Sequence, residues 1–257
     1  MKHSSIDPYL EGDGLLHRRD PRAKLLVVLV LVVALALVPV GGWVMYGLFS
    51  LVVIIMTAVA RVSLIHLLRR VLVVVPFVLP AVLFLPFLHG GEVLWQIKIG
   101  YWHLAIGHTG LVLAGSIVLK AMLSALTLGL LVTTTRITDL LVGLDKLGVP
   151  HLLTTLFGFM YRYLFVLSDE ALRLKSGRDA RYCGGFVTGI RSVGHMTGSI
   201  FLRSYDRAER VYGAMLLRGY DGNHCGLNQL RMGRADILMV ATVVVIAAST
   251  ILAARLL

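Results

Sequence analysis

The side chains best suited to bind a partner are arginines at predicted helix ends. Arg218 stands directly before Gly219 in the stretch 204–222, and Ala214 and Met215 precede it by four and three residues. At this spacing the three side chains share one helix face. Glycine most readily adopts the left-handed turn that follows a helix. An arginine beside a small apolar surface suits docking into a groove on another protein, although an ordinary capped surface helix has the same pattern.

A second arginine-bearing helix end is predicted upstream of the first. Arg178 and Arg181 stand there beside the small residues Ser176, Gly177 and Ala180. A guanidinium group can make forked hydrogen bonds to carboxylates or carbonyls, and small neighbours permit a close approach. The sequence has no Gly-x-x-x-x-Gly-Lys-Ser/Thr loop for binding ATP. Two such ends on a chain without its own ATP loop suit docking to two copies of a motor subunit.

Lys120 and three histidines are the remaining residues whose types can perform catalysis or bind a metal. Lys120 interrupts an apolar run, and a lysine at mid-membrane depth is by default a functional hypothesis. Its ammonium could instead snorkel, or bind backbone carbonyls of a kinked neighbour. His89, His103 and His108 fall in one predicted outer loop, but no cysteine or carboxylate cluster joins them. We therefore predict no metal site, no cofactor and no catalytic residue.

The elements that carry these residues are predicted to be membrane helices. The chain is 57% hydrophobic and only 15% charged, whereas about a quarter of the residues in soluble domains are charged. Long apolar runs predict an all-α, polytopic membrane protein with about five transmembrane helices. They cover residues 23–40, 43–60, 71–88, 111–135 and 235–257. Three prolines in the third run predict kinks and packing inside the bundle.

The distribution of basic residues predicts the topology. The N-terminal tail and the segment 61–70 are basic, whereas the segment 89–109, expected to be a loop, has Lys98 as its single lysine or arginine. The segment 136–234 holds more than half of the lysines and arginines. The positive-inside rule places the N-terminus and this segment in the cytoplasm. The formal charge of +11 thus reports topology, and no nucleic-acid partner is expected.

The chain is expected to divide into three parts. Residues 1–135 comprise the tail and four spans, 136–234 the cytoplasmic coupling helices, and 235–257 the last span. Within the middle part we expect a short helix from Thr138 to Gly148, followed by helices over 151–181, 186–203 and 204–218.

Three stretches together resemble a known transporter family. Residues 16–25 read Leu-His-Arg-Arg-Asp-Pro-Arg-Ala-Lys-Leu, and Thr133-Thr134-Thr135 precedes Asp139-Leu140-Leu141 and Leu147-Gly148-Val149-Pro150. Residues 214–220 read Ala-Met-Leu-Leu-Arg-Gly-Tyr. They resemble, in order, the start of the first span, the exit from the fourth span and the second coupling motif of one family. This is the transmembrane T component of energy-coupling factor (ECF) transporters, most closely the cobalt-type member CbiQ.

The resemblance implies which residues couple the chain to its partners. In that family, two Ala-Arg-Gly-type motifs end helices that dock into grooves of two ATPase subunits. Arg218, supported by Ala214 and Gly219, would form the second motif, although Leu217 replaces the alanine before the arginine. The first motif would use Arg178, which follows Gly177 where alanine is usual, or the shifted Arg181.

The resemblance further implies a role without catalysis by this chain. Two ATP-binding cassette ATPases would hydrolyse ATP, and the membrane domain would reorient a separate substrate-binding membrane (S) subunit within the lipid bilayer of a bacterial inner membrane. Cobalt is the implied cargo, with nickel or a vitamin as alternatives. Two other classes stay open: a membrane-embedded enzyme using Lys120 and the outer-loop histidines, and a self-sufficient channel or carrier. Against both, Glu92 is the single acidic residue from the start of the first span to the end of the fourth.

Overall fold

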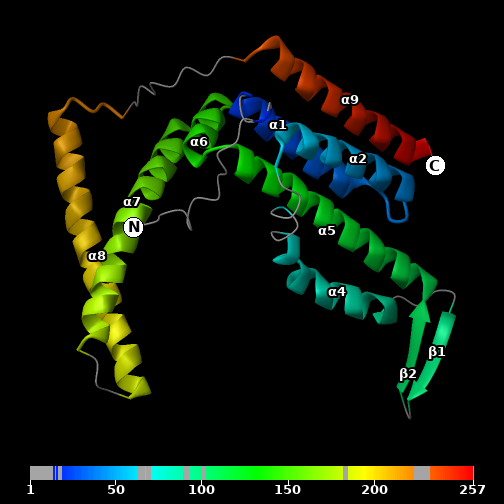
Figure 1. Ribbon diagram of the computed structural model, residues 1–257, viewed down its shortest axis with the longest axis horizontal. Coiled ribbons are helices and arrows are strands. Elements are labelled where there is room, and N and C mark those ends of the chain that lie inside the picture. The colour runs from blue at the N-terminus through cyan, green and yellow to red at the C-terminus, as the bar shows by residue number, and fades with distance from the viewer. Residues whose placement is uncertain are drawn as a thin grey trace. The chain divides into compact units, whose positions relative to one another are not determined.

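The structure is a computed structural model of the 257-residue chain. It describes residues 14, 16, 19–62, 67, 71–88, 93–99, 102–181, 185–222 and 232–256 (Figure 1). The chain divides into two compact units, one formed by residues 4–143 and 230–257 and the other by residues 144–229. The three-part division at residues 135 and 234 stays a prediction.

Helices of the first unit follow the five predicted apolar runs. They are α1 (Pro21–Leu37), α2 (Trp43–Ala60), α4 (Val75–Leu88), α5 (His108–Thr134) and α9 (Arg234–Leu256). Among the described residues, α2, α5 and the stretch Arg234–Leu252 of α9 are long and apolar enough to cross a membrane. With 17 and 14 residues, α1 and α4 are shorter than a straight crossing requires. The prediction of an all-α polytopic membrane protein is confirmed.

Helices α1 and α5 make most of the helix–helix contacts in this unit. Helix α1 packs against α9, α5 and α2, and α5 packs in turn against α2 and α4. The interior between them is apolar and includes Val27, Leu31, Leu35, Phe49, Leu123 and Val243. The outward side chains are also apolar: Leu29, Val44 and Phe77 are 62%, 86% and 81% exposed. Helices that are apolar on every side are suited to a lipid environment.

The start of α1 matches its sequence signals. Asp20 is the N-cap, and its carboxylate accepts a hydrogen bond of 2.9 Å from the backbone N–H of Arg22. Pro21 is the first helical residue, where its missing N–H costs nothing. The helix ends at Leu37, two residues before Pro39. The described chain thus confirms both predicted boundary signals of the first apolar helix.

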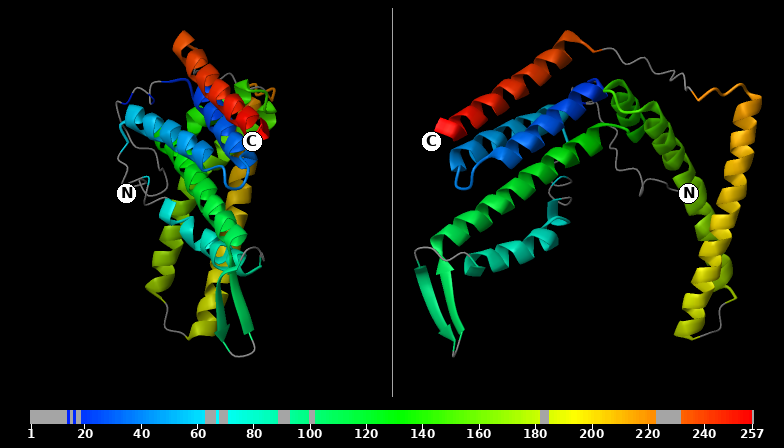
Figure 2. Two further views of the ribbon diagram at one scale, coloured as in Figure 1. Left: turned by 90° about the vertical axis from the view of Figure 1, so that its right-hand side faces the viewer. Right: turned by 180° about the vertical axis from the view of Figure 1, so that it is seen from behind.

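The segment 89–109 was predicted to be a loop, but it contains a β-hairpin. The prediction of its conformation was therefore wrong. Strand β1 (Val93–Ile99) pairs antiparallel with β2 (Trp102–Gly107), which leads directly into α5 (Figures 1 and 2). In the sequence, β-branched and aromatic residues alternate with other types along the first segment, and large apolar residues occupy every second position from Trp102 to Ile106 in the second. Alternation with a period of two is typical of strands. The scarcity of basic residues in this segment predicts its side of the membrane but not its conformation.

The second unit is built on two long helices. The short α6 (Ile137–Lys146) begins in the first unit and ends in the second, and α7 (His151–Asp179) and α8 (Phe186–Leu217) form an antiparallel pair (Figures 1 and 2). The predicted helices at 138–148 and 151–181 are confirmed within two residues at each end. The predicted break between residues 203 and 204 is absent from the described helix α8. No glycine or proline stands there, and the Ser204 hydroxyl donates to the Phe201 carbonyl within the helix (2.7 Å).

Candidate functional site

The C-terminal end of α8 has a well-defined cap. Arg218 is the C-cap residue, and Gly219 follows with φ of +80°. The Tyr220 N–H donates to the Met215 carbonyl (3.0 Å), and the Gly219 N–H donates to the Leu216 carbonyl (3.0 Å). This pair of bonds is the Schellman motif, and the positive φ is the reason that glycine is needed. The predicted left-handed turn at Gly219 is confirmed.

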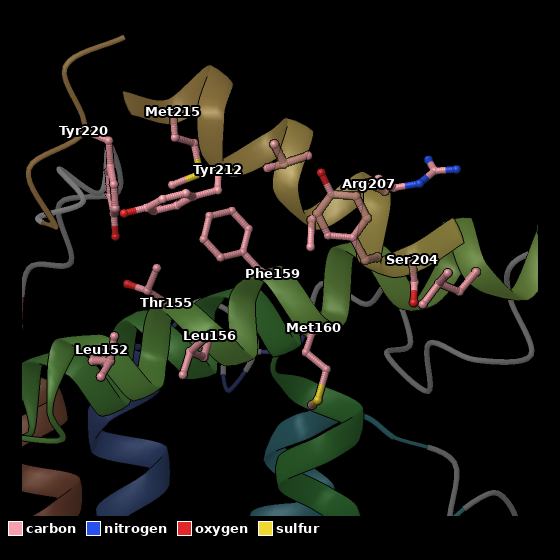
Figure 3. A pocket seen from close by; sticks show the side chains of 14 residues that line it. Leu152, Thr155, Leu156, Phe159, Met160, Ser204, Arg207, Tyr212, Met215 and Tyr220 are labelled. Atoms are coloured by element: carbon pink, nitrogen blue, oxygen red, sulfur yellow. The ribbon is translucent and has the colours of Figure 1, made fainter. Parts of the chain in front are cut away.

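This cap determines which side chains the helix end presents. Met215 and Tyr220 both face the groove beside α8 (Figure 3), while Ala214 and Arg218 are exposed. Leu217, directly before the arginine, is 91% exposed. The end of α8 therefore offers a forked cationic donor next to an unburied apolar side chain. Such a surface can bind a partner by ion pairing and apolar contact.

The end of α7 carries the other two candidate arginines. The Arg178 guanidinium donates from Nε (3.0 Å) and from Nη2 (2.7 Å) to Oδ1 of Asp179. Ala180 is the C-cap residue, and the Arg181 N–H donates to the Arg178 carbonyl at 2.9 Å. Arg181 is exposed, and within the described part of the chain it forms no ion pair. The two arginines therefore differ, because a carboxylate already binds Arg178.

An apolar groove of about 490 Å³ lies between the first half of α7 and the second half of α8 (Figure 3). Aromatic and thioether side chains line much of it, with Phe159 and Met160 on α7 and Tyr212 on α8. Its remaining lining residues are Leu152, Thr155, Leu156, Tyr163, Leu167, Ser204, Arg207, Ala208, Val211, Met215 and Tyr220. Sequence reasoning missed this groove because it assigned the second half of α8 to a separate helix.

The start of α7 is fixed by a carboxylate on α6. Asp145 accepts from Nδ1 of His151 (2.8 Å) and from the Thr154 hydroxyl (3.1 Å). Because a carboxylate only accepts, Nδ1 must carry the proton. The hydrogen bond from His151 is the main reason that the pKa of Asp145 lies below its ordinary value of 3.8. This polar link joins the end of α6 to the first turn of α7.

Lys120 binds backbone carbonyls. Its Nζ donates to the carbonyl oxygens of Val38 (2.7 Å) and Ala36 (3.1 Å) at the end of α1. The structure thus confirms the predicted pairing with carbonyls of a neighbouring helix. A reactive lysine would need its nitrogen free of such contacts, so the arrangement disfavours the alternative of an enzyme built on Lys120.

Lys24, near the start of α1, is a functionally suggestive residue that the sequence did not single out. It is 3% exposed, and its Nζ donates to the Thr134 carbonyl at 3.0 Å. Lys24 therefore joins the start of α1 to the end of α5. In the sequence, Lys24 is a lysine at the start of an apolar run, and a basic residue there ordinarily indicates only which end of the helix is cytoplasmic.

The three histidines do not assemble a metal site among the described residues. His108 is the first residue of α5, His103 lies in β2, and His89 falls outside the described residues. Within the described part of the chain, no group of three or more His, Cys, Asp or Glu side chains could hold a metal ion. His103 and His108 thus belong to no such group within the described residues.

Comparisons with known proteins give a consistent result. Residues 12–227 match the family described as CbiQ, cobalt transport protein. The energy-coupling factor transporter transmembrane protein EcfT of Lactococcus lactis subsp. cremoris is 26% identical over 260 residues, covering 95% of this chain and 96% of that protein. EcfT of Bacillus subtilis is 30% identical over 236 residues, 86% of each chain. A fused cobalt transport protein CbiMQ of Methanocorpusculum labreanum is 31% identical over 137 residues, 52% of this chain and 22% of that protein.

Proposed function

The chain belongs to the CbiQ cobalt transport protein family, and we propose that it is the transmembrane coupling subunit of an energy-coupling factor importer for cobalt ions. It binds two ATP-binding cassette ATPases, which hydrolyse the ATP. A separate substrate-binding membrane subunit receives the metal. The chain itself performs no chemistry and passes movement from the ATPases to that subunit.

The observation that carries this proposal is the cap of α8. The Schellman motif presents Arg218 and Leu217 at the tip of a 32-residue helix, both of them exposed. A long helix is stiff, so a force applied at the C-terminal end of α8 displaces the whole helix. An exposed arginine and leucine at this tip are a suitable contact for a groove on an ATPase.

For the second contact we propose Arg181 over Arg178. The Arg178 guanidinium is already bound by Asp179, whereas Arg181 is exposed beyond the helix cap. Docking through Arg181 breaks no existing ion pair. The resulting preference for Arg181 is small, because a surface ion pair such as Arg178–Asp179 contributes about 0–1 kcal/mol. Separate charge reversals of the two arginines distinguish them.

The proposed orientation places the N-terminus and α6, α7 and α8 in the cytoplasm. The segment 136–234 carries most of the basic residues, and positive segments remain on the cytoplasmic side. The ATPases must act there, because ATP is cytoplasmic. Cysteine labelling in intact cells tests this: an impermeant maleimide should fail to reach Leu217→Cys and should reach it after permeabilisation. If Leu217→Cys is labelled in intact cells, the end of α8 lies outside the cytoplasm and the proposed orientation is wrong.

Purification of the tagged chain from membranes, without crosslinker, tests the proposed assembly. We expect two ATP-binding cassette ATPases and one further membrane protein to co-elute with it. Vesicles containing this assembly should take up radioactive Co²⁺ when ATP is supplied. Preferential uptake of Ni²⁺ would reassign the cargo and leave the coupling role in place. A chain that elutes alone and transports without ATP would refute the proposal.

A further inference from the structure

Glu170 of α7 is a buried carboxylate that forms partly exposed ion pairs with two arginines of α8. Its side chain is buried, with the residue 8% exposed. One carboxylate oxygen, Oε1, accepts from Nη1 of Arg203 (3.1 Å), and the other, Oε2, accepts from Nη2 of Arg207 (3.3 Å). The two arginines are four residues apart, so they project from the same face of α8. We refer to these three residues as the Glu170 clamp.

The Glu170 clamp lies between the two arginine-bearing helix ends. Glu170 precedes Arg178 by eight residues, or about 12 Å along α7 at 1.5 Å per residue. Arg207 precedes Arg218 by eleven residues, or about 16 Å along α8. The clamp therefore joins the two helices at a point between the two arginine-bearing ends.

The Glu170 clamp opposes sliding of α7 along α8, whereas the apolar side chains of the neighbouring groove do not. The groove is lined mainly by apolar side chains, and apolar contact is non-directional, so helices can slide or splay with little change in energy. Hydrogen bonds between a guanidinium and a carboxylate depend on direction, because the donor and acceptor atoms must be aligned. A buried carboxylate that loses its cationic partners remains as an uncompensated charge. Sliding by one turn would separate both oxygens of Glu170 from their donors.

We propose that Glu170 is a positioning residue for energy coupling. Through Arg203 and Arg207 it holds α7 and α8 as one rigid lever, so that movement at Arg218 reaches the end of α7 with little loss. This inference rests on the proposed function, because transmission has meaning only if both ends bind ATPases. Without the clamp, ATPase docking persists, but each helix end moves independently. ATP is then hydrolysed without transport.

The test measures the number of metal ions transported per ATP hydrolysed by the reconstituted transporter. The variants are Glu170→Ala, the pair Arg203→Ala with Arg207→Ala, and all three changes together. We expect each to keep ATPase binding and hydrolysis within about twofold of the wild type and to lower the transport ratio at least tenfold. If the three residues act as one unit, the triple variant is no worse than Glu170→Ala. The matched controls Glu209→Ala and Arg210→Ala, both exposed on α8, should keep the wild-type ratio.

A spectroscopic measurement separates positioning from simple stabilisation. Spin labels at the exposed residues Lys175 and Leu217 report the distance distribution between the two helices. We expect a narrow distribution in the wild type and a broader one in Glu170→Ala at unchanged helix content. Glu170→Gln keeps the side-chain shape and one acceptor oxygen, so it should give intermediate values of width and transport ratio.

Three results would overturn the positioning role. They are a wild-type transport ratio in Glu170→Ala, strictly additive losses in the triple variant, and failure of even Glu170→Gln to assemble, which would make Glu170 a purely structural residue. Failure of the proposed function is recognised separately. In that case the wild-type chain itself would bind no ATPase, and there would be no transport ratio to compare.

Discussion

The ammonium nitrogen of Lys120 lies 2.7 Å from the carbonyl oxygen of Val38. Helix α1 ends at Leu37, and the last carbonyls of a helix have no partner within it. Pro39 follows and has no N–H to offer. Lys120, from the neighbouring helix α5, donates to two of these carbonyls. A lysine within an apolar span is thus explained by the end of an adjacent helix.

The first prediction is that Lys120 contributes to stability and not to chemistry. Lys120→Met should destabilise the protein by about 1–3 kcal/mol, because bonds from a charged donor to two carbonyls are lost. Lys120→Arg keeps the charge and the donors, so it should lose less. Thermal unfolding in detergent, followed by circular dichroism, measures both. Loss of transport by Lys120→Met at unchanged stability would contradict this role.

The second prediction concerns Lys24, which is more deeply buried. Lys24→Met removes the donor to the Thr134 carbonyl. The loss of a charged donor to a buried acceptor costs about 1–3 kcal/mol, and Lys24 is more deeply buried than Lys120. We therefore expect Lys24→Met to yield much less monodisperse protein than Lys120→Met from the same expression system. Equal yields of the two variants would show that the Lys24 contacts contribute little.

The third prediction concerns the turn after α8. Gly219→Ala places a Cβ on a residue with φ of +80°, which costs about 1–2 kcal/mol. Gly219→Asn should cost less, because asparagine tolerates this conformation. Gly213→Ala is the matched control: it makes the same change inside α8, where the added Cβ meets no atom within 4 Å. If Gly219→Ala melts at the same temperature as Gly213→Ala, the cap does not contribute to stability.

The fourth prediction concerns pH. The hydrogen bond from His151 lowers the pKa of Asp145 below 3.8 in the folded chain. The Asp145 contacts therefore stabilise the fold above the unfolded pKa of about 3.9, and this stability is lost as pH falls through the lower, folded pKa. Asp145→Ala should cost about 1 kcal/mol at pH 7 and progressively less at pH 4 and below.

The pH dependence is checked by urea unfolding in detergent at several pH values. The exposed Asp206→Ala on α8 serves as the control and should show little effect at any pH. A cost of Asp145→Ala that stays constant from pH 7 down to pH 3 would mean that its carboxylate charge does not matter.

Much of the helical architecture could be predicted because apolar runs are unambiguous signals. The run from Trp43 to Ala60 became α2 with the predicted bounds, and Asp20 and Pro21 marked the start of α1. The hairpin of β1 and β2 was not predicted, although its alternating pattern is present in the sequence. A scarcity of basic residues predicts the side of the membrane on which a segment lies, but it does not distinguish a loop from a hairpin.

The long-range contacts could not be predicted. Glu170 lies 33 and 37 residues from Arg203 and Arg207, and nothing in one sequence specifies which buried charge meets which arginine. The pairing of Lys120 with Val38 spans 82 residues and was foreseen only as a type of contact. Tertiary contacts depend on how helices cross, and helical periodicity determines only which residues share a face.

The most direct measurement of the central claim is ATPase capture by the Arg218→Glu variant. The control is Arg210→Glu, the same charge reversal at another exposed position of α8. Purified from membranes, Arg218→Glu should retain less than about a tenth of the ATPase bound by the wild type and should take up no cobalt, while inserting normally. Arg210→Glu should behave as the wild type. Unchanged ATPase capture and cobalt uptake by Arg218→Glu would contradict the coupling role assigned to the end of α8.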